Sequence, residues 1–292
     1  MATFFELPSG GRLAVDETGD PRGTPVFFFH GWPASRLQGS GFSMEARELG
    51  ARIISPDRPG VGLSSHQPGR ALLDWPPLIR EVARQLGIAR FRVLAISGGG
   101  PYALATAHAL PEMIDSVVIV SGAPPLHAEV DQHELLPVYR WLLAAYRTRP
   151  EFLRRLFGLA RPIATMQPPA WSWPLLLRFV PPADRVALRD PRTFEGCFAV
   201  YREAWRGSAN GVIADGEVYA REWGFRPEDV RVPIRLWHGR NDRSFSWQLA
   251  ERLARRIPDC TTRFVENEGH YSLPIRHRRA ILTDLLQATP AS

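Results

Sequence analysis

The stretch Phe91-Arg-Val-Leu-Ala-Ile-Ser97-Gly-Gly-Gly-Pro101 joins a nearly continuous apolar run to a cluster of glycines. An apolar run of this kind, without alternation, is typical of a strand buried on both faces of a parallel sheet. The segment Tyr102-Ala-Leu-Ala-Thr-Ala-His-Ala-Leu110 that follows is rich in helix formers and ends at a proline. We therefore predict a sharp strand-to-helix turn with Ser97 at its centre and the small residues Ala95 and Gly99 on either side.

Two other interpretations of this segment compete with a reactive serine. The first is an ordinary strand-to-helix turn whose serine has no chemical role. The second is a dinucleotide-binding turn, because Gly98-Gly-Gly-Pro-Tyr-Ala103 has the spacing G-x-G-x-x-A after a strand. That fingerprint expects an acidic residue about twenty positions further on, and the next apolar run, Val117-Val-Ile-Val-Ser-Gly122, ends without one. The sequence therefore disfavours dinucleotide binding.

Short apolar runs with strand character occur on both sides of this segment. Several of them, such as Val26-Phe-Phe-Phe29, are continuous, and helical segments such as Asp74 to about Gly87 alternate with them. We predict an α/β fold with a mostly parallel, eight-stranded sheet and helices on both faces. Its strands are expected near residues 3–7, 11–17, 25–29, 51–56, 91–96, 116–121, 232–238 and 261–266, the first two as a hairpin.

The alternation of strands and helices stops after Gly122 and resumes at Val232. Between these points, residues 123–230 show helical periodicity, many aromatic residues and prolines, and no convincing strand. We therefore predict a sheet domain formed by residues 1–122 and 231–292, and a helical lid or cap inserted at residues 123–230.

Three further segments place polar residues directly after predicted strands. They are Phe27-Phe-Phe-His-Gly-Trp32-Pro33, Ile234-Arg-Leu-Trp-His-Gly-Arg-Asn-Asp242 and Glu266-Asn-Glu-Gly-His270. Since the carboxyl ends of parallel strands meet at one edge of a sheet, we expect these residues to lie close to Ser97. A serine hydroxyl is a weak nucleophile until a base takes its proton, and an imidazole base needs an acid to hold its tautomer. Ser97, His270 and Asp242 can supply these three groups.

In this order, the segments resemble those of the α/β-hydrolase fold superfamily, in particular its serine esterase-type subgroup with a helical lid. The resemblance implies that Ser97 is the nucleophile of a catalytic triad, His270 the base and Asp242 the acid. It also implies an oxyanion hole formed by the backbone N–H groups of Trp32 and Gly98. The implied reaction is cleavage of a carboxylic ester, or of a related acyl bond, through an acyl-enzyme, with no metal or organic cofactor.

The sequence departs from the commonest pattern of this family at two places. Ala95 stands where the nucleophile motif usually has glycine, and Ser246 stands where relatives often have proline after the acid. A fifth segment, Pro56-Asp-Arg-Pro-Gly-Val-Gly-Leu-Ser64, also matches, and we expect it to brace loops rather than to catalyse. Rival candidates for the triad acid are Glu266, Glu268 and, more remotely, Asp215.

The composition limits the chemistry and the partners. All 36 basic residues are arginine, which excludes Schiff-base enzymes, P-loop NTPases and a lysine base. The formal net charge of +6 is spread over scattered arginines, so we expect no nucleic-acid partner.

No apolar run is long enough to cross a membrane and no signal peptide is visible, so we expect a cytoplasmic protein without a membrane partner. Cys197 and Cys260 are too few for a disulfide framework. A homodimer is compatible with the sequence.

The aromatic residues of the insertion are the expected substrate-binding groups. Large apolar side chains favour a neutral, largely hydrophobic small-molecule substrate, unless Arg202 or Arg206 turns inward to bind a carboxylate. The run from His127 to Glu134 collects potential metal ligands without a recognised spacing, and we expect a solvated helix face there rather than a metal site. The expected lining residues are Trp141, Tyr146, Trp171, Trp173 and Phe179.

Other functions stay open on the sequence alone. A serine nucleophile disfavours the epoxide hydrolases and haloalkane dehalogenases of this fold, which use aspartate. A C–C bond hydrolase with the same triad is one alternative. A ligand receptor or binding module that keeps the scaffold without catalysis is another, because a fold does not determine a function. A nucleotide-dependent oxidoreductase is a third, and cofactor binding would reveal it.

Overall fold

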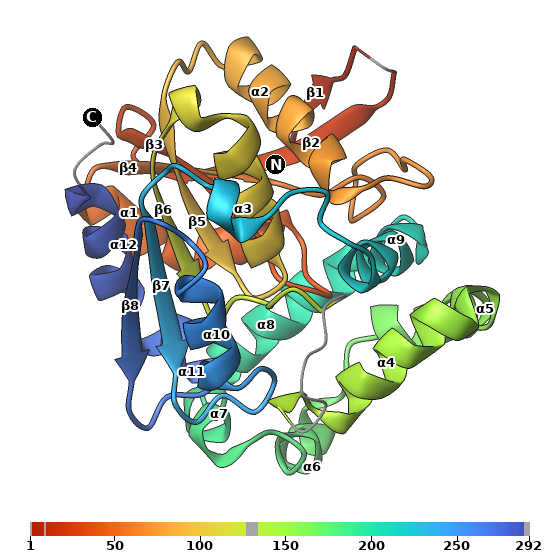
Figure 1. The fold of residues 1–292 in the computed structure, drawn as a ribbon. Helices are drawn as coiled ribbons and strands as arrows, with labels where there is room; N and C mark the ends of the chain where they lie inside the picture. Colours follow the sequence, from red (N-terminus) through yellow and green to blue (C-terminus); the bar gives the residue numbers. More distant parts are fainter. Residues whose placement is uncertain (1, 9, 127–133, 289–292) are drawn as a thin grey trace.

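A computed structural model describes residues 2–8, 10–126 and 134–288. An eight-stranded sheet with the order β1-β2-β4-β3-β5-β6-β7-β8 runs through the protein (Figure 1). The strand β2 is antiparallel to its neighbours β1 and β4, and the other neighbouring strands are parallel. The strands are β1 (Thr3–Glu6), β2 (Arg12–Gly19), β3 (Thr24–Phe29), β4 (Ala51–Pro56), β5 (Phe91–Ile96), β6 (Ile114–Val120), β7 (Ile234–Gly239) and β8 (Cys260–Val265). The predicted fold class and all eight strands are confirmed.

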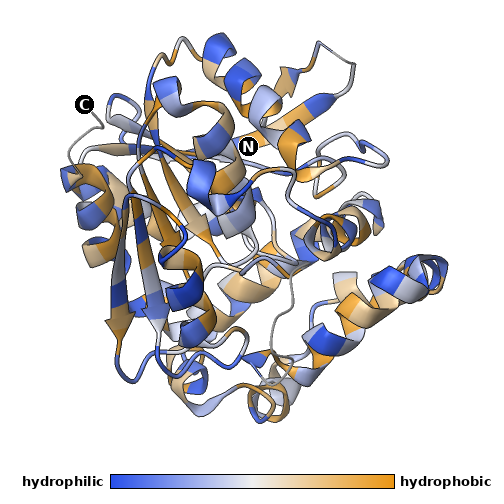
Figure 2. Cartoon of the chain, in the orientation of Figure 1, coloured by the Kyte–Doolittle hydropathy of each residue, from blue (hydrophilic) through white to orange (hydrophobic). Residues whose placement is uncertain are grey.

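Helices cover both faces of the sheet, which explains the continuous apolar runs of the central strands. On one face, Val26 and Phe28 pack against α1 (Ser43–Glu48) and α12 (Arg278–Gln287). On the other face, Phe27 and Phe29 pack in the core that α2 (Trp75–Gln85), α3 (Gly99–Ala109) and α10 (Trp247–Ala254) complete. Phe27, Phe28 and Phe29 are at most 1% exposed, and burial of such a side chain stabilises the fold by about 1.5–3 kcal/mol. Figure 2 shows the resulting pattern, in which the central strands are mostly apolar and the helices carry both apolar and hydrophilic residues.

In the described part of the chain, six α-helices lie between β6 and β7, at the end of the sheet toward which the parallel strands run (Figure 1). They are α4 (Pro137–Thr148), α5 (Pro150–Thr165), α6 (Trp173–Leu177), α7 (Pro182–Ala187), α8 (Pro191–Ala204) and α9 (Asn210–Ala220), and we call residues 137–220 the helical insertion. Proline opens four of them, where its missing N–H has no cost. Among the described residues 134–230 there is no strand, only an isolated bridge between Leu135 and Phe245.

The remaining elements are short. A helix α11 (Ser272–Arg276) precedes α12, and 3-10 helices occur at Arg36–Phe42, Leu72–Asp74, Pro111–Met113, Ala170–Ser172 and Pro227–Asp229. The potential metal ligands from His127 to His133 lie outside the described residues. Within the described part of the chain, no helix has the length and apolar character needed to cross a membrane.

Candidate active site

The turn between β5 and α3 holds Ser97 in a conformation that side chains rarely adopt. Its φ is +52°, in the left-handed region, which costs about 1–3 kcal/mol for a residue other than glycine. The surrounding backbone holds it there. The Ser97 N–H donates to the Val120 carbonyl at 2.9 Å, and the Ser97 carbonyl accepts from Gly100 N at 2.9 Å and Ala123 N at 3.0 Å. The hydroxyl is thereby presented at the carboxyl edge of the sheet.

The small residues after Ser97 are required by close approach of other chain segments. A Cβ at Gly99 would clash with the Phe29 carbonyl oxygen. A Cβ at Gly98 would lie 2.9 Å from Trp32 Cβ and 2.5 Å from the Tyr219 hydroxyl, closer than real Cβ atoms come. Only glycine at position 98 therefore lets the loop that carries Trp32 pass beside the serine turn.

The structure brings Ser97, His270 and Asp242 together in one hydrogen-bonded chain. His270 Nε2 lies 2.9 Å from Ser97 Oγ, and His270 Nδ1 lies 2.8 Å from Asp242 Oδ2. An ionised carboxylate can only accept, so Nδ1 carries the proton and Nε2 is left as an acceptor for the serine hydroxyl. All three side chains are buried, at 6–7% exposure.

Two opposed effects determine the pKa of His270. Burial lowers it, but the charge and hydrogen bond of Asp242, together with the charge of Asp184, raise it more, so the pKa lies above its ordinary value. Burial raises the pKa of Asp242, but the charge and hydrogen bond of His270 lower it below its ordinary value. The pair is therefore arranged to stabilise an imidazolium beside a carboxylate.

Asp242 is held by its own loop. Its Oδ1 accepts from Ser244 N at 2.7 Å and from Phe245 N at 3.1 Å. His238, which the sequence analysis did not single out, lies 3.3 Å from Asp242 Oδ2 and 3.0 Å from the Phe245 carbonyl through Nε2. Its position at the end of β7, four residues before Asp242, was the available signal.

The rival acids are engaged elsewhere. Glu266 pairs with Arg240 at 2.7 Å, and Glu268 pairs with His277 at 3.0 Å. Asp215 pairs with Arg58 and Arg70. None of these carboxylates has a hydrogen bond to His270 in the described structure.

The loop after β3 presents the Trp32 N–H beside that of Gly98. Arg58 donates from Nη1 to the His30 carbonyl at 2.6 Å and from Nη2 to the Gly31 carbonyl at 2.7 Å. Gly31 N donates to Gln38 Oε1 at 2.8 Å. In a trans peptide the N–H points opposite to the C=O of the same unit, so the bond to the Gly31 carbonyl fixes the direction of the Trp32 N–H. Within the described residues, no acceptor is assigned to the Trp32 or Gly98 N–H.

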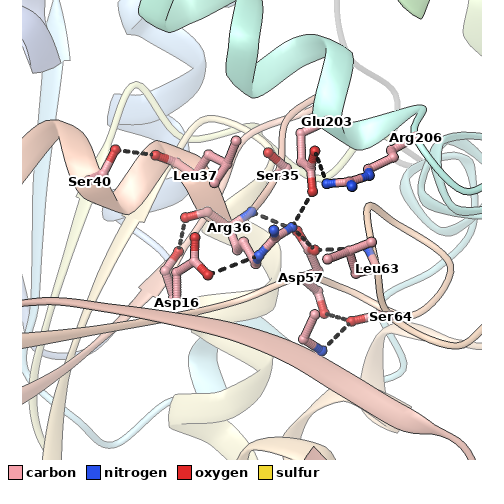
Figure 3. A network of polar contacts seen from close by, with 12 residues as sticks. Asp16, Ser35, Arg36, Leu37, Ser40, Asp57, Leu63, Ser64, Glu203 and Arg206 are labelled. Carbon is pink, nitrogen blue, oxygen red and sulfur yellow. Dashed lines mark hydrogen bonds and ion pairs between the residues drawn. The ribbon is translucent and has the colours of Figure 1, made fainter. Parts of the chain in front are cut away.

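The segment Pro56–Ser64 braces loops, as the sequence predicts. Asp57 accepts from the backbone N–H of Arg36 at 2.7 Å and from its guanidinium at 2.8 Å (Figure 3). Figure 3 also shows Glu203, from α8 of the helical insertion, which pairs with the same guanidinium at 2.6 Å. Asp57 therefore links the sheet edge to the loop after β3, and Glu203 extends that network into the helical insertion.

A pocket that opens to solvent lies at Ser97 between the sheet edge and the helices α4 and α9, and the empty space in it and at its mouth is about 420 Å³. Most of the side chains around it are apolar or aromatic. The helix α4 contributes residues spaced by three and four, so one face of that helix forms the wall. The lining residues are Trp32, Ser97, Gly98, Ala123, Leu126, Tyr139, Leu142, Leu143, Tyr146, Gly216, Tyr219 and Phe245.

Of the five aromatic residues expected to line the pocket, the structure places only Tyr146 there. Trp141 lies on the opposite face of α4 and is 48% exposed. Trp171 and Phe179 are 79% and 83% exposed, and Trp173 packs against Phe194 at a ring distance of 4.9 Å. The expectation was wrong for these four because aromatic content does not reveal which helix face turns inward. Arg202 and Arg206 are also absent from the lining.

A family model for the alpha/beta hydrolase fold matches residues 24–275 of this chain. An uncharacterized hydrolase of Bacillus subtilis is 30% identical over 141 residues, which cover 46% of this chain and 49% of that protein. The chain thus spans about half the length of the curated relatives that it matches.

Solved structures share the fold over nearly the whole chain. An esterase from Exiguobacterium antarcticum superposes with a TM-score of 0.69 at 20% identity and covers 98% of both chains. The epoxide hydrolase CorEH superposes with a TM-score of 0.71 at 17% identity, covering 98% of this chain and 97% of that one. At such identities the likeness concerns the fold alone, so the reaction has to be argued from the site.

Proposed function

Because the chain belongs to the α/β-hydrolase fold family, we propose that it is a serine hydrolase that cleaves a carboxylic ester or a related acyl bond. The observation that carries this proposal is the continuous chain Ser97–His270–Asp242 with contacts of 2.9 and 2.8 Å. It lies next to the backbone N–H groups of Trp32 and Gly98, to which no acceptor is assigned among the described residues. A nucleophile, a base, an acid and oxyanion donors in mutual reach are the groups that acyl transfer needs.

In the proposed mechanism, Ser97 Oγ attacks the acyl carbon while His270 Nε2 takes the hydroxyl proton. The carbonyl oxygen becomes an oxyanion, which the N–H groups of Trp32 and Gly98 stabilise. The tetrahedral intermediate collapses to an acyl-enzyme, and His270 gives its proton to the leaving alcohol. Water then attacks the acyl-enzyme with His270 again as base, and Asp242 stabilises the imidazolium in both halves of the reaction.

The proposed substrate is a small, neutral and largely hydrophobic molecule. The pocket wall supports this, because Leu142, Leu143 and Phe245 are apolar and no arginine is among the described residues that line the pocket. We further propose that residues 123–230 act as the lid that decides which acyl group is accepted. The side chains of α4 that face Ser97 would make that choice.

Hydrolysis of a panel of aryl esters with acyl chains of increasing length tests the proposal. Wild-type protein should turn over part of the panel, and Ser97→Ala should lose that activity while it folds and binds the same esters. A fluorophosphonate should label the wild type at Ser97, located by mass spectrometry. Equal turnover by wild type and Ser97→Ala would overturn the proposal, and binding without turnover by the wild type would favour the receptor alternative.

A further inference from the structure

Two buried carboxylates of the helical insertion reach the loops that carry the proposed base and oxyanion donor. Asp184 in α7 is 1% exposed, and Asp215 in α9 is fully buried. Neither residue lines the pocket at Ser97. Burial of a charge is costly unless it is paired and hydrogen-bonded, so the partners of these two carboxylates indicate what they hold in place.

Asp184 binds the backbone of the loop that carries His270. Its Oδ2 accepts from His270 N at 3.1 Å, and its Oδ1 accepts from Tyr271 N and Ser272 N, each at 2.8 Å. Three consecutive N–H groups thus end on one carboxylate, 86 to 88 residues away in the sequence. Because all three partners are donors, the site fits an ionised carboxylate, which can only accept.

Among the described residues, the titratable groups around His270 leave two carboxylates as its charged neighbours. Burial lowers the pKa of His238, and burial raises the pKa of Cys197 on α8, so both groups are neutral near pH 7. Burial also raises the pKa of Tyr139 on α4 to about 12 and raises that of Tyr271 in the same loop. The charged neighbours are Asp242, after β7, and Asp184 on α7.

Asp215 acts through Arg58 on the loop after β3, which carries Trp32. Its Oδ2 accepts from Arg58 Nε at 2.8 Å, and its Oδ1 accepts from the Tyr102 hydroxyl at 2.9 Å and from Arg70. Arg58 in turn donates to the His30 and Gly31 carbonyls. The guanidinium is planar, so the carboxylate that binds its Nε side also fixes the direction of its two other donors. A cation at the Gly31 carbonyl further polarises the peptide whose N–H belongs to Trp32.

We propose that Asp184 and Asp215 are positioning residues, through which the helical insertion holds the base and the oxyanion donor in place. The inference rests on the proposed function and deepens it. The insertion is then part of the catalytic apparatus and not only a cover over the pocket. Glu203 is the control, because it also joins the insertion to the sheet domain by an ion pair. Its partner is Arg36, four residues beyond Trp32, and it binds neither Arg58 nor the backbone of the His270 loop.

The test for Asp184 is the pH profile of kcat/KM. Asp184→Asn keeps the shape of the side chain but removes a charge beside His270, so the acidic limb should move to lower pH. At pH 8, kcat should fall about tenfold, because an amide cannot accept from all three N–H groups. Asp184→Glu keeps the charge, so the acidic limb of its kcat/KM profile should stay at the wild-type pH while kcat falls. If both Asp184 variants had the same acidic limb and the same kcat as Glu203→Gln, the proposal would be overturned.

The test for Asp215 is the affinity for an alkyl trifluoromethyl ketone, which forms a tetrahedral adduct with a serine. Asp215→Asn should weaken this affinity and lower kcat by about tenfold to a hundredfold, with KM and the acidic limb nearly unchanged. If Asp215→Asn does not fold, Arg58→Lys decides, because it keeps a cation beside Asp215 but cannot reach both carbonyls. An adduct affinity equal to that of Glu203→Gln would overturn the proposal.

The kinetics of Ser97→Ala distinguish a failure of this inference from a failure of the proposed function. Loss of activity in Ser97→Ala with unchanged kinetics in both aspartate variants would overturn this inference alone. Full activity in Ser97→Ala would overturn the proposed function and this inference with it.

A different observation concerns the outer side of the helical insertion. Residues 136–180 contain seven arginines and one acidic residue, Glu151, so their formal net charge of +6 equals that of the whole chain. The same segment holds ten of the fourteen large hydrophobic side chains that are exposed among the described residues. These ten are Val138, Trp141, Phe152, Leu156, Leu159, Ile163, Met166, Trp171, Leu175 and Phe179.

The helix α5 shows how the two features combine. Phe152, Leu156, Leu159 and Ile163 are spaced by four, three and four residues, so they share one face, and that face is exposed. Leu153, which is fully buried, marks the adjacent side of the helix, which packs on α8 and α9. Apolar and hydrophilic residues alternate along α4 and α5 at the edge of the molecule (Figure 2). An exposed apolar face within a basic segment is typical of helices that lie on anionic lipid surfaces.

We infer that the exposed apolar face of α5, together with the other exposed apolar side chains of residues 136–180, docks on a membrane surface that contains anionic lipids. The prediction of no membrane partner rested on the absence of a spanning segment, which such a contact does not need. Vesicles of phosphatidylcholine with phosphatidylglycerol should sediment the protein, less so at high salt, and pure phosphatidylcholine should not. Leu159→Ser with Ile163→Ser, at side chains 80% and 74% exposed, should lose sedimentation and keep ester turnover.

Three results would overturn this second inference. The first is no sedimentation with anionic vesicles, and the second is equal sedimentation with both kinds of vesicle. The third is a dimer in light scattering that the double substitution separates, because the apolar face would then be covered by a second copy of the chain.

Discussion

The sheet edge and the helical insertion hold their functional groups in different ways. At the sheet edge, Ser97 is fixed by backbone groups of its own turn and of the next strand, and Asp242 by N–H groups two and three residues further on. The loop of His270 is fixed by Asp184, 86 residues away on α7. The proposed nucleophile and acid are therefore positioned locally, whereas the proposed base and one proposed oxyanion donor depend on contacts across the two parts of the molecule.

The largest expected effect is on the locally held nucleophile. Ser97→Ala should lower kcat by about 10⁴-fold or more, because no other group can form the acyl-enzyme. The decrease is measured with the best ester of the panel under saturating substrate. Ser40→Ala, a substitution at a serine of the 3-10 helix after β3, serves as the control and should leave kcat unchanged. A residual activity above about 1% of wild type would contradict the assignment.

A large effect on stability is expected where the helical insertion meets the sheet domain. Asp215→Ala leaves Arg58 and Arg70 buried without their shared carboxylate, so it should lower the free energy of unfolding by about 3–5 kcal/mol. Asp190→Ala removes only an exposed helix cap of the insertion and should cost about 1 kcal/mol. Urea unfolding at pH 7 measures the free energy of unfolding of both variants. Equal decreases in the two variants would contradict the expected difference between the buried contact and the exposed cap.

The pH dependence of that contact follows from the pKa of Asp215. Burial raises it, but Arg58 and Arg70 lower it from 3.8 to about 2. A depressed carboxyl pKa contributes stability above its unfolded value, and this contribution is lost as the pH falls through the folded value. The stability difference between wild type and Asp215→Ala should thus persist at pH 5 and shrink between about pH 4 and pH 2. If the stability difference between wild type and Asp215→Ala disappeared by pH 5, the ion pairs of Asp215 with Arg58 and Arg70 would not be the cause of that difference.

The pH dependence of turnover tests the role of His270 as the proposed base. His270 must be neutral to accept the serine proton, so activity should fall as the pH drops through its pKa. Asp242 and Asp184 raise that pKa above the ordinary value of about 6.5 in spite of burial, and the acidic limb of kcat/KM should lie above that value. Rates between pH 5 and pH 9 locate the limb. A limb below pH 6.5 would contradict the electrostatic account of the site.

The same division explains what could be predicted from the sequence. Ser97, Trp32, Asp242 and His270 lie at strand ends, where the chain geometry requires particular residue types at particular places, and the structure brings these four together. The pocket wall could not be predicted in the same way, since a rotation of α4 by about 100° per residue decides between Trp141 and Leu142. Asp184 and Asp215 have no local signature, because their partners are far away in the sequence.

The smallest expected effect separates the inner face of α4 from its outer face. Leu143 lines the pocket and Trp141 is 48% exposed, although only one residue lies between them. Leu143→Ala should enlarge the acyl site and change the ratio of kcat/KM between long and short acyl esters by about tenfold, as expected for a few methylene groups in an apolar pocket. Trp141→Ala and Trp171→Ala should leave that ratio within about twofold, because neither side chain reaches Ser97. Competition between two esters in one reaction measures the ratio directly, so errors in enzyme concentration cancel. If Trp171→Ala changed the ratio as strongly as Leu143→Ala, the acyl group would be chosen on the outer surface of the helical insertion, and the pocket at Ser97 would not be the specificity element.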